Sequence, residues 1–372
     1  MRVVVAQETA DGERRVAVVP DTVATLTAAG HEVWVQAGAG LHAFVVDDDL
    51  AARGAQIVTD RAQLLQGADV VLGVQPLPVG DISQLRAGAV TLSFLQPWAH
   101  GNSVRALAAR SVTSFSLDLV PRISRAQSMD ALSSQALVAG YRAVMIAAST
   151  APRLFPLFMT AAGTVPPAKV LVLGAGVAGL QAIATARRLG AMVTAYDVRA
   201  AAGEEVRSLG ANFLELELST QEGEGGYARV QSEDFLGRQR ALLGEQVAKA
   251  DVVLTTAAVP GKPAPLLVTA EMVADMRPGS VIVDLGADVE AAEGGGNCEL
   301  TRGGQTIDVH GVTIVGPRNA ASSYPLHASS LYARNVANLL TLLSRDGQFA
   351  PDWDDEIVAA CCVTRDGEVV TT

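Results

Sequence analysis

Short runs of β-branched residues alternate with amphipathic stretches over the first part of the chain. Alternating or continuous apolar positions predict strands, and apolar positions spaced by three or four residues predict helices. The elements predicted in this way are Arg2–Ala6, Thr22–Ala29, Glu32–Gln36, Asp47–Ala52, Gln56–Val58, Arg61–Gln66, Val70–Val74, Val90–Phe94, Ser103–Arg110 and Ser111–Ser116. Such a βα rhythm is typical of a parallel sheet covered by helices.

The same rhythm returns in the second half after an interruption. The pattern is helical from about Ala126 to Thr150, and the Gly- and Pro-rich stretch Ala161–Ala168 predicts a linker. A βαβ pattern then runs from Lys169 to about Gly316. We therefore expect a connecting helix and a second α/β domain.

The end of the chain predicts a helix at Ser329–Ser344 and a hairpin at Ile357–Val370 that turns at Asp366 and Gly367. This tail is too small to fold alone, so we expect it to dock on the first domain. The 372 residues exceed what one core holds, about 250 to 300 residues. The predicted fold class is α/β, with two Rossmann-like, doubly wound parallel-sheet domains and a cleft between them. The predicted domains are residues 1–132 plus 325–372, and residues 133–324.

Composition narrows the classes of function. A hydrophobic share of 49% with only 4% aromatic residues suits an interior of small aliphatic residues, in which helices pack closely on a sheet. A net charge of -11 argues against nucleic-acid binding, because that affinity comes largely from Lys and Arg. The cysteines Cys298, Cys361 and Cys362 form no CxxC motif, so we expect no disulfide framework and no metal site, as fits a reducing cytoplasm.

No segment predicts export or a membrane span. The start, Met1–Ala6, lacks the basic stretch and long apolar core of a signal peptide. The long apolar run Val170–Ala186 contains closely spaced glycines, so it predicts a buried strand, a turn and a helix. We expect the chain to have no transmembrane segment of its own.

These glycines form a G-x-G-x-x-G fingerprint between a predicted strand and a predicted helix. The motif reads Gly174-Ala175-Gly176-Val177-Ala178-Gly179. In a dinucleotide site the first glycine makes the tight turn, the second lets the backbone reach the pyrophosphate, and the third lets the helix approach the sheet. The helix N-terminus then offers N–H groups to the phosphates. The alternative is that the glycines only pack a helix on a strand.

The next predicted strand, Met192–Tyr196, ends in Asp197, at the distance from the last glycine that the fingerprint requires. An acid here binds the adenosine ribose hydroxyls and repels a 2′-phosphate, which favours NAD(H) over NADP(H). Val198 and Arg199 follow, and the cation of Arg199 weakens this preference. The sequence predicts NAD(H) as the cofactor.

The chain is poor in groups that could act as a general base, which an alcohol or amino-acid dehydrogenase needs. His31 follows Gly30 and is expected at a surface turn, while His42 and His100 are expected to be solvated in loops. The only lysines are Lys169, Lys249 and Lys262. Composition therefore excludes a lysine-dependent amino-acid site in the first domain.

A dense polar segment runs from Pro121 to Asp130 and continues with further polar residues, Ser133, Ser134 and Gln135. If it is a loop that enters a helix, its side chains could converge on a small polar ligand such as a carboxamide and ribose. Those side chains are Arg122, Gln127, Asp130 and Ser133. Equally, Ser and Asp could cap the helix while Arg is solvated. The residues alone leave both interpretations open.

With these segments in view, the chain resembles the NAD(H)-binding soluble alpha subunits of the proton-translocating nicotinamide nucleotide transhydrogenases, in the alanine dehydrogenase/transhydrogenase superfamily. The matching segments span most of the chain. They are 121–127, 141–144, 160–165, 174–185, 196–199, 225–228, 260–265 and 295–298. The segment from Arg122 to Ser133 is far more specific than the glycine fingerprint.

The resemblance implies a role for each region of the site. Residues corresponding to Arg122, Gln127, Asp130 and Ser133 surround the nicotinamide and its ribose, and Gln127 lies toward the NADP(H) of a partner subunit. Arg122, Gln127 and Asp130 are thus expected to take part in catalysis, and Tyr227 in a mobile loop at 222–229 closes over NAD(H). Hydride passes directly between two nicotinamides, so the missing base is expected.

The resemblance also implies partners and a location. We expect a homodimer, peripherally associated with the inner, cytoplasmic face of the cell membrane. An NADP(H)-binding subunit and a membrane subunit are expected to couple hydride transfer to proton translocation. Two segments, 285–294 and 319–325, depart from the family pattern and could alter the partner interface or the adenosine end.

Two other functions compete with this one. An alanine-dehydrogenase-like enzyme resembles the chain in its architecture and in Arg15, but the catalytic Lys and His of that family match Gln75 and Gln96 here, and neither glutamine can act as a base. A non-catalytic NAD(H)-binding module is the third possibility. The intact polar set from Arg122 to Ser133 counts against it.

Overall fold

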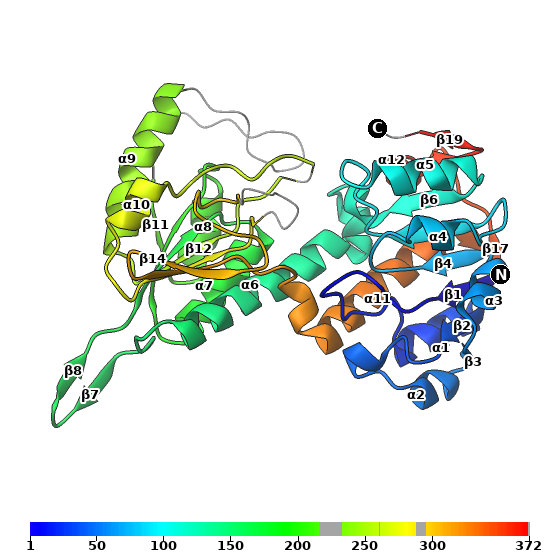
Figure 1. Cartoon of the computed structure of the whole chain (residues 1–372), viewed down its shortest axis with the longest axis horizontal. Helices are drawn as coiled ribbons and strands as arrows, with labels where there is room; N and C mark the ends of the chain where they lie inside the picture. The colour runs from blue at the N-terminus through cyan, green and yellow to red at the C-terminus, as the bar shows by residue number, and fades with distance from the viewer. Residues whose placement is uncertain (216–232, 260, 288–294, 371–372) are drawn as a thin grey trace. The chain divides into compact units, whose positions relative to one another are not determined.

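The computed structural model describes residues 1–215, 233–259, 261–287 and 295–370. The chain divides into two compact units: unit 1 is Met1–Gln135 with Ala321–Thr372, and unit 2 is Ala136–Ala320 (Figure 1). Each unit is a mostly parallel sheet covered by helices, which confirms the predicted α/β fold class. The domain boundaries given by the sequence analysis stay a prediction.

Unit 1 is built on an eight-stranded sheet in the order β19-β18-β6-β5-β4-β1-β2-β3. The strands are β1 (Arg2–Val5), β2 (Glu32–Gln36), β3 (Gln56–Val58), β4 (Val70–Leu72), β5 (Val90–Ser93), β6 (Thr113–Ser116), β18 (Cys362–Arg365) and β19 (Glu368–Val369). The helices are α1 (Pro20–Ala28), α2 (Asp47–Ala51), α3 (Arg61–Gln66), α4 (Val79–Ile82), α5 (Gly101–Ala109), α11 (Pro325–Leu342) and α12 (Glu356–Cys361), with 3-10 turns η1 (Leu41–Ala43), η2 (Leu117–Leu119), η3 (Ser124–Met129) and η5 (Ala321–Ser323). The C-terminal tail extends this sheet, because β18 lies antiparallel to β6 with Cys362 opposite Phe115.

Both faces of the unit 1 sheet are covered. Val3 and Val5 of β1 pack into one hydrophobic cluster with Tyr332 of α11. Val4 points the other way, into a cluster with Leu107 of α5. Since successive residues of a strand face opposite sides, a strand buried on both faces reads as a continuous apolar run. This explains the sequence pattern that predicted β1.

Unit 2 contains a seven-stranded sheet in the order β11-β10-β9-β12-β13-β15-β14, parallel except for the pair β14 and β15. Its strands are β9 (Lys169–Leu173), β10 (Met192–Tyr196), β11 (Asn212–Phe213), β12 (Val252–Thr255), β13 (Val281–Asp284), β14 (Thr306–Val309) and β15 (Val312–Val315). Its helices are α6 (Ala131–Thr150), which begins in unit 1, α7 (Val177–Arg188), α8 (Ala202–Ser208), α9 (Glu233–Lys249) and α10 (Ala270–Ala274). The run Val170–Ala186 is therefore a strand, a turn and a helix, as predicted.

Helix α6 is, among the described helices, the one long and apolar enough to cross a bilayer by length and composition alone. This differs from the expectation that no segment could do so. The same criterion is met by core helices of water-soluble proteins, and 39% of the apolar window is buried. The helix also packs tightly: a Cβ added at Gly140 would lie 2.1 Å from the carbonyl oxygen of Ala178 in α7.

Two local predictions before β9 are wrong. The helix expected from Ala126 begins only at Ala131, because Asp130 has ψ 84, outside the helical range, and the preceding residues form η3. The stretch 161–168, expected as a linker, includes the turn and second strand of a hairpin, β7 (Phe158–Thr160) and β8 (Gly163–Val165). Gly163 adopts φ +134, which its lack of a side chain permits.

Two further differences lie near the termini. Helix α11 begins earlier than predicted, at Pro325, a residue suited to a first helical turn because it has no N–H to leave unpaired. The hairpin expected from Ile357 turns at Asp366 and Gly367 as predicted, but its first segment is helix α12. His31, expected at a surface turn, is only 4% exposed, and its burial lowers its pKa.

Substituting Gly140 tests the packing of α6 on α7. Gly140→Ala should lower the free energy of unfolding by about 1 to 3 kcal/mol, because the added methyl group meets the backbone of Ala178 and overpacks the interface. The measurement is urea denaturation followed by circular dichroism. Gly237→Ala, in α9, is the matched control: its Cβ would meet no atom within 4 Å, so the substitution should stabilise the helix. Equal effects of the two substitutions would contradict the packing argument.

Candidate functional site

The turn between β9 and α7 has the geometry of a phosphate-binding loop. Gly174 has φ +100, a conformation that favours glycine. A Cβ on Gly176 would meet nothing within 4 Å, so this position is open to a ligand, whereas a Cβ on Gly179 would lie 1.9 Å from the carbonyl oxygen of Gly174. The first glycine thus makes the turn, the second leaves space, and the third allows close packing.

Helix α7 begins directly at this turn. Gly176 is its N-cap residue and has no side chain to cap the helix, so the first N–H groups, including those of Val177 and Ala178, are available. Gly176 and Val177 are exposed, and the helix carries Arg187 and Arg188 in its last turn. Its N-terminus therefore offers unpaired donors and the positive end of the helix dipole to an anion.

Asp197 fixes the turn from the β10 side. Its Oδ2 accepts a hydrogen bond from the backbone N–H of Ala175 at 2.7 Å, and its Oδ1 accepts from the backbone N–H of Arg199 at 2.9 Å. The Arg199 guanidinium also pairs with this carboxylate at 3.0 Å. Val198 packs against the core cluster of the neighbouring face. The structure thus places the acid beside the fingerprint, and engages with that acid the arginine that weakened the preference for NAD(H).

The strand order reverses at β9, since β10 lies on one side of it and β12 on the other. In doubly wound sheets, ligands bind outside the carboxyl ends of the strands at such a switch point. Thr256, directly after β12, donates a hydrogen bond from its Oγ1 to the carbonyl oxygen of Gly174 at 3.0 Å. Its backbone N–H donates to Leu173 at 2.8 Å. The crevice is therefore bordered by the glycine turn and by Thr256, a residue that sequence reasoning missed.

The polar segment lies in unit 1 and is partly organised by helix capping. The Asp130 carboxylate accepts hydrogen bonds from the backbone N–H of Ser133 at 2.8 Å and from its hydroxyl at 2.5 Å. Arg122 and Gln127 are exposed. The capping interpretation is thus observed for Asp130 and Ser133. It leaves the exposed Arg122 and Gln127 accessible for a ligand, so both interpretations of the segment hold at once.

Turn η3 is held against α11, and so its exposed residues have a fixed base. The carbonyl oxygen of Ser128 accepts hydrogen bonds from the side-chain amides of Asn335 at 2.9 Å and Asn338 at 3.0 Å. Arg125 pairs with Asp355 at 2.5 Å. Tyr227, expected in a loop that closes over the cofactor, lies outside the described residues.

A buried charged cluster at the carboxyl ends of β1 and β4 was not found by sequence reasoning. Glu13 and Arg15 form an ion pair at 2.6 Å, and the Arg15 Nη1 donates to Gln135 at 2.8 Å. The Gln75 amide donates to Glu13 at 2.8 Å. Burial alone would raise the pKa of Glu13, but the hydrogen bonds and charge of Arg15 outweigh it and lower that pKa to about 2. Arg15 is therefore already paired within the protein.

Glu8 belongs to the same cluster but forms no ion pair with a cation among the described residues. Its carboxylate accepts hydrogen bonds from the backbone N–H groups of Val74 at 2.5 Å and Gln75 at 3.3 Å. Burial raises the pKa of Glu8 to about 7, against the lowering effect of these bonds. Acidic residues just after the end of a buried strand are the signal that could have pointed to Glu8 from the sequence.

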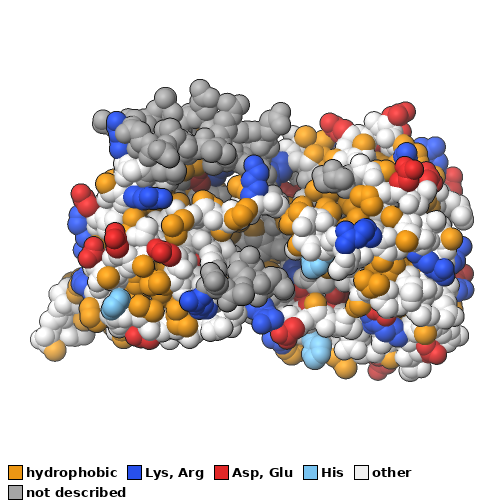
Figure 2. Space-filling view, turned by 45° about the horizontal axis from the view of Figure 1, so that its top comes forward, with side chains coloured by type: hydrophobic (Ala, Val, Ile, Leu, Met, Phe, Trp, Pro, Cys, Tyr) orange, Lys and Arg blue, Asp and Glu red, His pale blue; other side chains and the backbone are white. Residues whose placement is uncertain are grey.

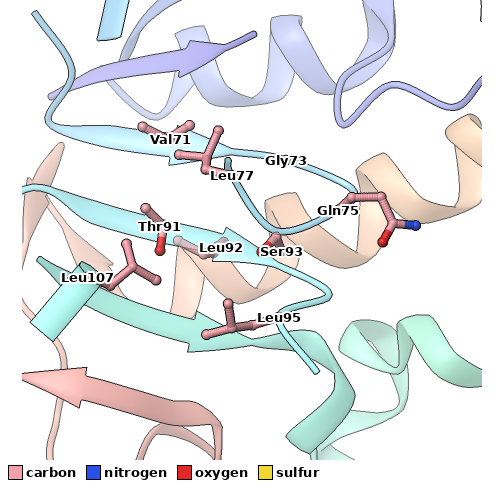
Figure 3. A pocket seen from close by; sticks show the side chains of 9 residues that line it. All are labelled: Val71, Gly73, Gln75, Leu77, Thr91, Leu92, Ser93, Leu95 and Leu107. Atoms are coloured by element: carbon pink, nitrogen blue, oxygen red, sulfur yellow. The ribbon is translucent and has the colours of Figure 1, made fainter. Parts of the chain in front are cut away.

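A small pocket lies beside this cluster, at the ends of β4 and β5 (Figure 3). Its lining is mostly apolar and includes Val71, Leu92 and Leu95, while the side chain of Gln75 extends away from the others. No residue of the lining can act as a general base. Gln96, nearby in sequence, has φ 44 and donates its backbone N–H to Asp118 at 2.9 Å. Neither glutamine supplies the chemistry of a lysine or a histidine.

Comparison with known proteins covers the whole chain. Two family profiles match: alanine dehydrogenase/PNT, N-terminal domain, at residues 4–139, and alanine dehydrogenase/PNT, C-terminal domain, at residues 143–372. A chain of NAD(P) transhydrogenase subunit alpha from Rhodospirillum rubrum is 47% identical over 380 residues, covering 100% of this chain and 98% of that one. Alanine dehydrogenase of Mycobacterium tuberculosis is 33% identical over 345 residues, covering 91% of this chain and 86% of that protein.

Among solved structures, a transhydrogenase from Sinorhizobium meliloti is similar over the full length. It is 44% identical with a TM-score of 0.86, covering 100% of this chain and 99% of that chain. The fold described above is therefore shared with a protein of nearly the same length.

The stability of unit 1 should depend on pH through Glu8. The carboxyl has an ordinary pKa of 4.5 in the unfolded chain and a pKa of about 7 in the folded one. It therefore contributes stability that is present below pH 4.5 and is lost as the pH rises to about 7. Glu8→Gln should remove this slope and raise the free energy of unfolding above about pH 7, measured by urea denaturation across this range. Glu32→Gln, at an exposed carboxylate, is the control and should keep the wild-type slope. A wild-type slope in Glu8→Gln would contradict the assignment.

Proposed function

Since this chain belongs to the alanine dehydrogenase/PNT family, we propose that it is the NAD(H)-binding alpha subunit of an NAD(P) transhydrogenase. Hydride passes between NAD(H) on this chain and NADP(H) on a partner subunit, and membrane subunits couple the transfer to proton translocation. The full-length similarity to a transhydrogenase alpha subunit supports this function. The oxidoreductase activity therefore needs partner subunits.

The observation that carries the assignment of NAD(H) is the glycine turn held between Asp197 and Thr256. A ligand's pyrophosphate fits the space beside Gly176, where a Cβ would meet no atom. The N-terminus of α7 stabilises the phosphate charge. The Asp197 carboxylate is placed to bind ribose hydroxyls and repels a 2′-phosphate, which supports NAD(H) over NADP(H).

The polar segment of unit 1 supplies the reacting end of the site. NAD(H) supplies the hydride chemistry at its nicotinamide. Arg122, Gln127, Asp130 and Ser133 bind and orient the nicotinamide and its ribose, with Gln127 toward the partner's NADP(H). Asp130 and Ser133 hold each other by two hydrogen bonds, so this end of the segment is organised before a ligand binds. No proton is exchanged with a substrate, so orientation and approach of the two rings replace acid–base catalysis.

The alternative alanine dehydrogenase activity has less support. The relative named alanine dehydrogenase is less similar, at 33% identity, than the transhydrogenase subunit, at 47%. Gln75 gives its amide hydrogen to Glu13, and Arg15 is neutralised by the same carboxylate. Neither residue is then available for an amino-acid substrate, and the adjacent pocket offers no base.

We propose in addition that the protein is a homodimer and associates peripherally with the inner, cytoplasmic face of the cell membrane through its membrane partner. The support for a dimer is the β7–β8 hairpin, which projects from unit 2 in both views (Figures 1 and 2). It and the segment before it expose Leu157, Phe158, Met159 and Val165, with Met159 77% exposed. An isolated hairpin is marginally stable in water, so these apolar side chains need a covering surface.

Hydride transfer with a partner tests the central proposal. The purified chain is mixed with an NADP(H)-binding transhydrogenase domain, and reduction of an acetylpyridine analogue of NAD by NADPH is followed by absorbance. Transfer should require both proteins. Absence of transfer at every partner ratio, with NADH binding intact, would leave a non-catalytic NAD(H)-binding module, and alanine-dependent reduction of NAD by the chain alone would establish the alternative enzyme.

Gln127→Asn separates cofactor binding from transfer. The shorter side chain should slow hydride transfer by about tenfold or more, because positioning of the two rings depends on it. The affinity for NADH, measured by fluorescence titration, should stay nearly unchanged. A collapse of NADH affinity would show that Gln127 binds NAD(H) rather than facing the partner's cofactor.

Met159→Asp tests the proposed dimer surface. A carboxylate on an apolar interface is costly to bury, so the variant should dissociate to a monomer in sedimentation velocity at micromolar concentration. Val79→Asp, at another exposed apolar residue in α4, is the control and should remain dimeric. A monomeric wild-type protein, or a dimeric Met159→Asp variant, would contradict the dimer proposal.

A further inference from the structure

Asn297 is a fully buried residue that holds the segment following β12 at several points. Its Nδ2 donates hydrogen bonds to the carbonyl oxygens of Ala257 and Pro265, both at 2.8 Å. Its own carbonyl oxygen accepts hydrogen bonds from the backbone N–H groups of Leu267 at 2.8 Å and Val268 at 2.9 Å. One side chain and one peptide group thus anchor this segment at both of its ends.

The Asn297 side chain is kept despite an unmade hydrogen bond. Its Oδ1 is buried without a hydrogen-bond partner among the described residues, and a Cβ on Gly286 would lie 2.7 Å from it. An unsatisfied buried acceptor costs about 1 to 3 kcal/mol, so an apolar residue would relieve that cost at this position. The asparagine therefore serves its two donor bonds rather than overall stability.

Asp284 fixes the position of Asn297. Its carboxylate accepts hydrogen bonds from the hydroxyl of Thr255 at 2.7 Å, the N–H of Cys298 at 2.9 Å and the hydroxyl of Thr301 at 2.8 Å. A Cβ on Gly296 would lie 2.3 Å from the same carboxylate. The Gly-Asn-Cys sequence at 296–298 is thus explained by a buried polar centre that joins the ends of β12 and β13.

The segment that Asn297 holds is the one that borders the cofactor crevice. Ala257 follows Thr256, whose hydroxyl donates to the carbonyl oxygen of Gly174. A Cβ on Gly174 would lie 2.8 Å from that hydroxyl and 3.1 Å from the N–H nitrogen of Ala257, so the two segments are in direct contact. A continuous path of hydrogen bonds and contacts leads from Asn297 to the phosphate-binding turn.

We propose that Asn297 is a positioning residue for NAD(H): through Ala257 and Thr256 it holds the glycine turn in the conformation that receives the pyrophosphate. The inference rests on the proposed NAD(H) site and adds to it a residue that does not line the crevice. Loss of the two donor bonds releases Ala257 and Pro265, and the turn loses its support on the β12 side. Support from Asp197 on the β10 side remains, so binding weakens without being abolished.

Three variants test the inference by NADH titration of the isolated full chain, without any partner. Asn297→Asp puts a carboxylate oxygen opposite two carbonyl oxygens and should weaken NADH binding by about tenfold. Thr256→Val removes the hydroxyl that binds Gly174 and should weaken binding by a similar factor, whereas Thr256→Ser keeps the hydroxyl and should restore it. The Thr256 pair decides the matter even if Asn297→Asp does not fold.

Ser280→Ala is the matched control for stability. Ser280 is fully buried at the start of β13, at the opposite edge of the same sheet, and its hydroxyl donates to Ala250. This variant should lower the melting temperature while leaving NADH affinity unchanged. Equal NADH affinity in wild type, Asn297→Asp and Thr256→Val would overturn the inference alone, because the wild-type chain would still bind NADH. A wild-type chain that binds no NADH would overturn the proposed function as well.

Discussion

The approach of helix α7 to the turn after β9 is the contact on which the rest of unit 2 depends. Gly179 lies so close to the carbonyl oxygen of Gly174 that any side chain would force the helix away from the sheet. With the helix displaced, its N-terminal N–H groups would no longer point into the crevice at the switch point. Asp197 and Thr256 hold the turn from the two neighbouring strands, so backbone, sheet order and cofactor site form one arrangement.

Local patterns predicted much of this fold. Continuous apolar runs predicted β9 and β1 because both faces of each sheet are covered by helices. The glycine fingerprint and Asp197 predicted the cofactor turn, since each glycine has a backbone role that depends on close neighbours in sequence. The capping bonds of Asp130 were foreseen as one of two interpretations for the same reason.

The features that sequence reasoning missed depend on contacts between distant segments. Glu8 binds the backbone at Val74, and Asn297 binds the backbone at Ala257, so their partners have no side-chain signature in the sequence. The burial of His31 likewise depends on what packs around it, and its own polarity suggested the surface. The hairpin β7–β8 was missed because its residues are all exposed and show no hydrophobic alternation.

The distribution of cations has a practical consequence for chemical labelling. The only lysines, Lys169, Lys249 and Lys262, are exposed and belong to unit 2. The primary amine of unit 1 is the N-terminus of Met1, which donates to the carbonyl oxygen of Gly347. Arginine does not react as an amine, so acylating reagents distinguish the two units by residue chemistry. Lys262 lies within the segment that Asn297 holds, which makes it an internal reporter at the border of the cofactor crevice.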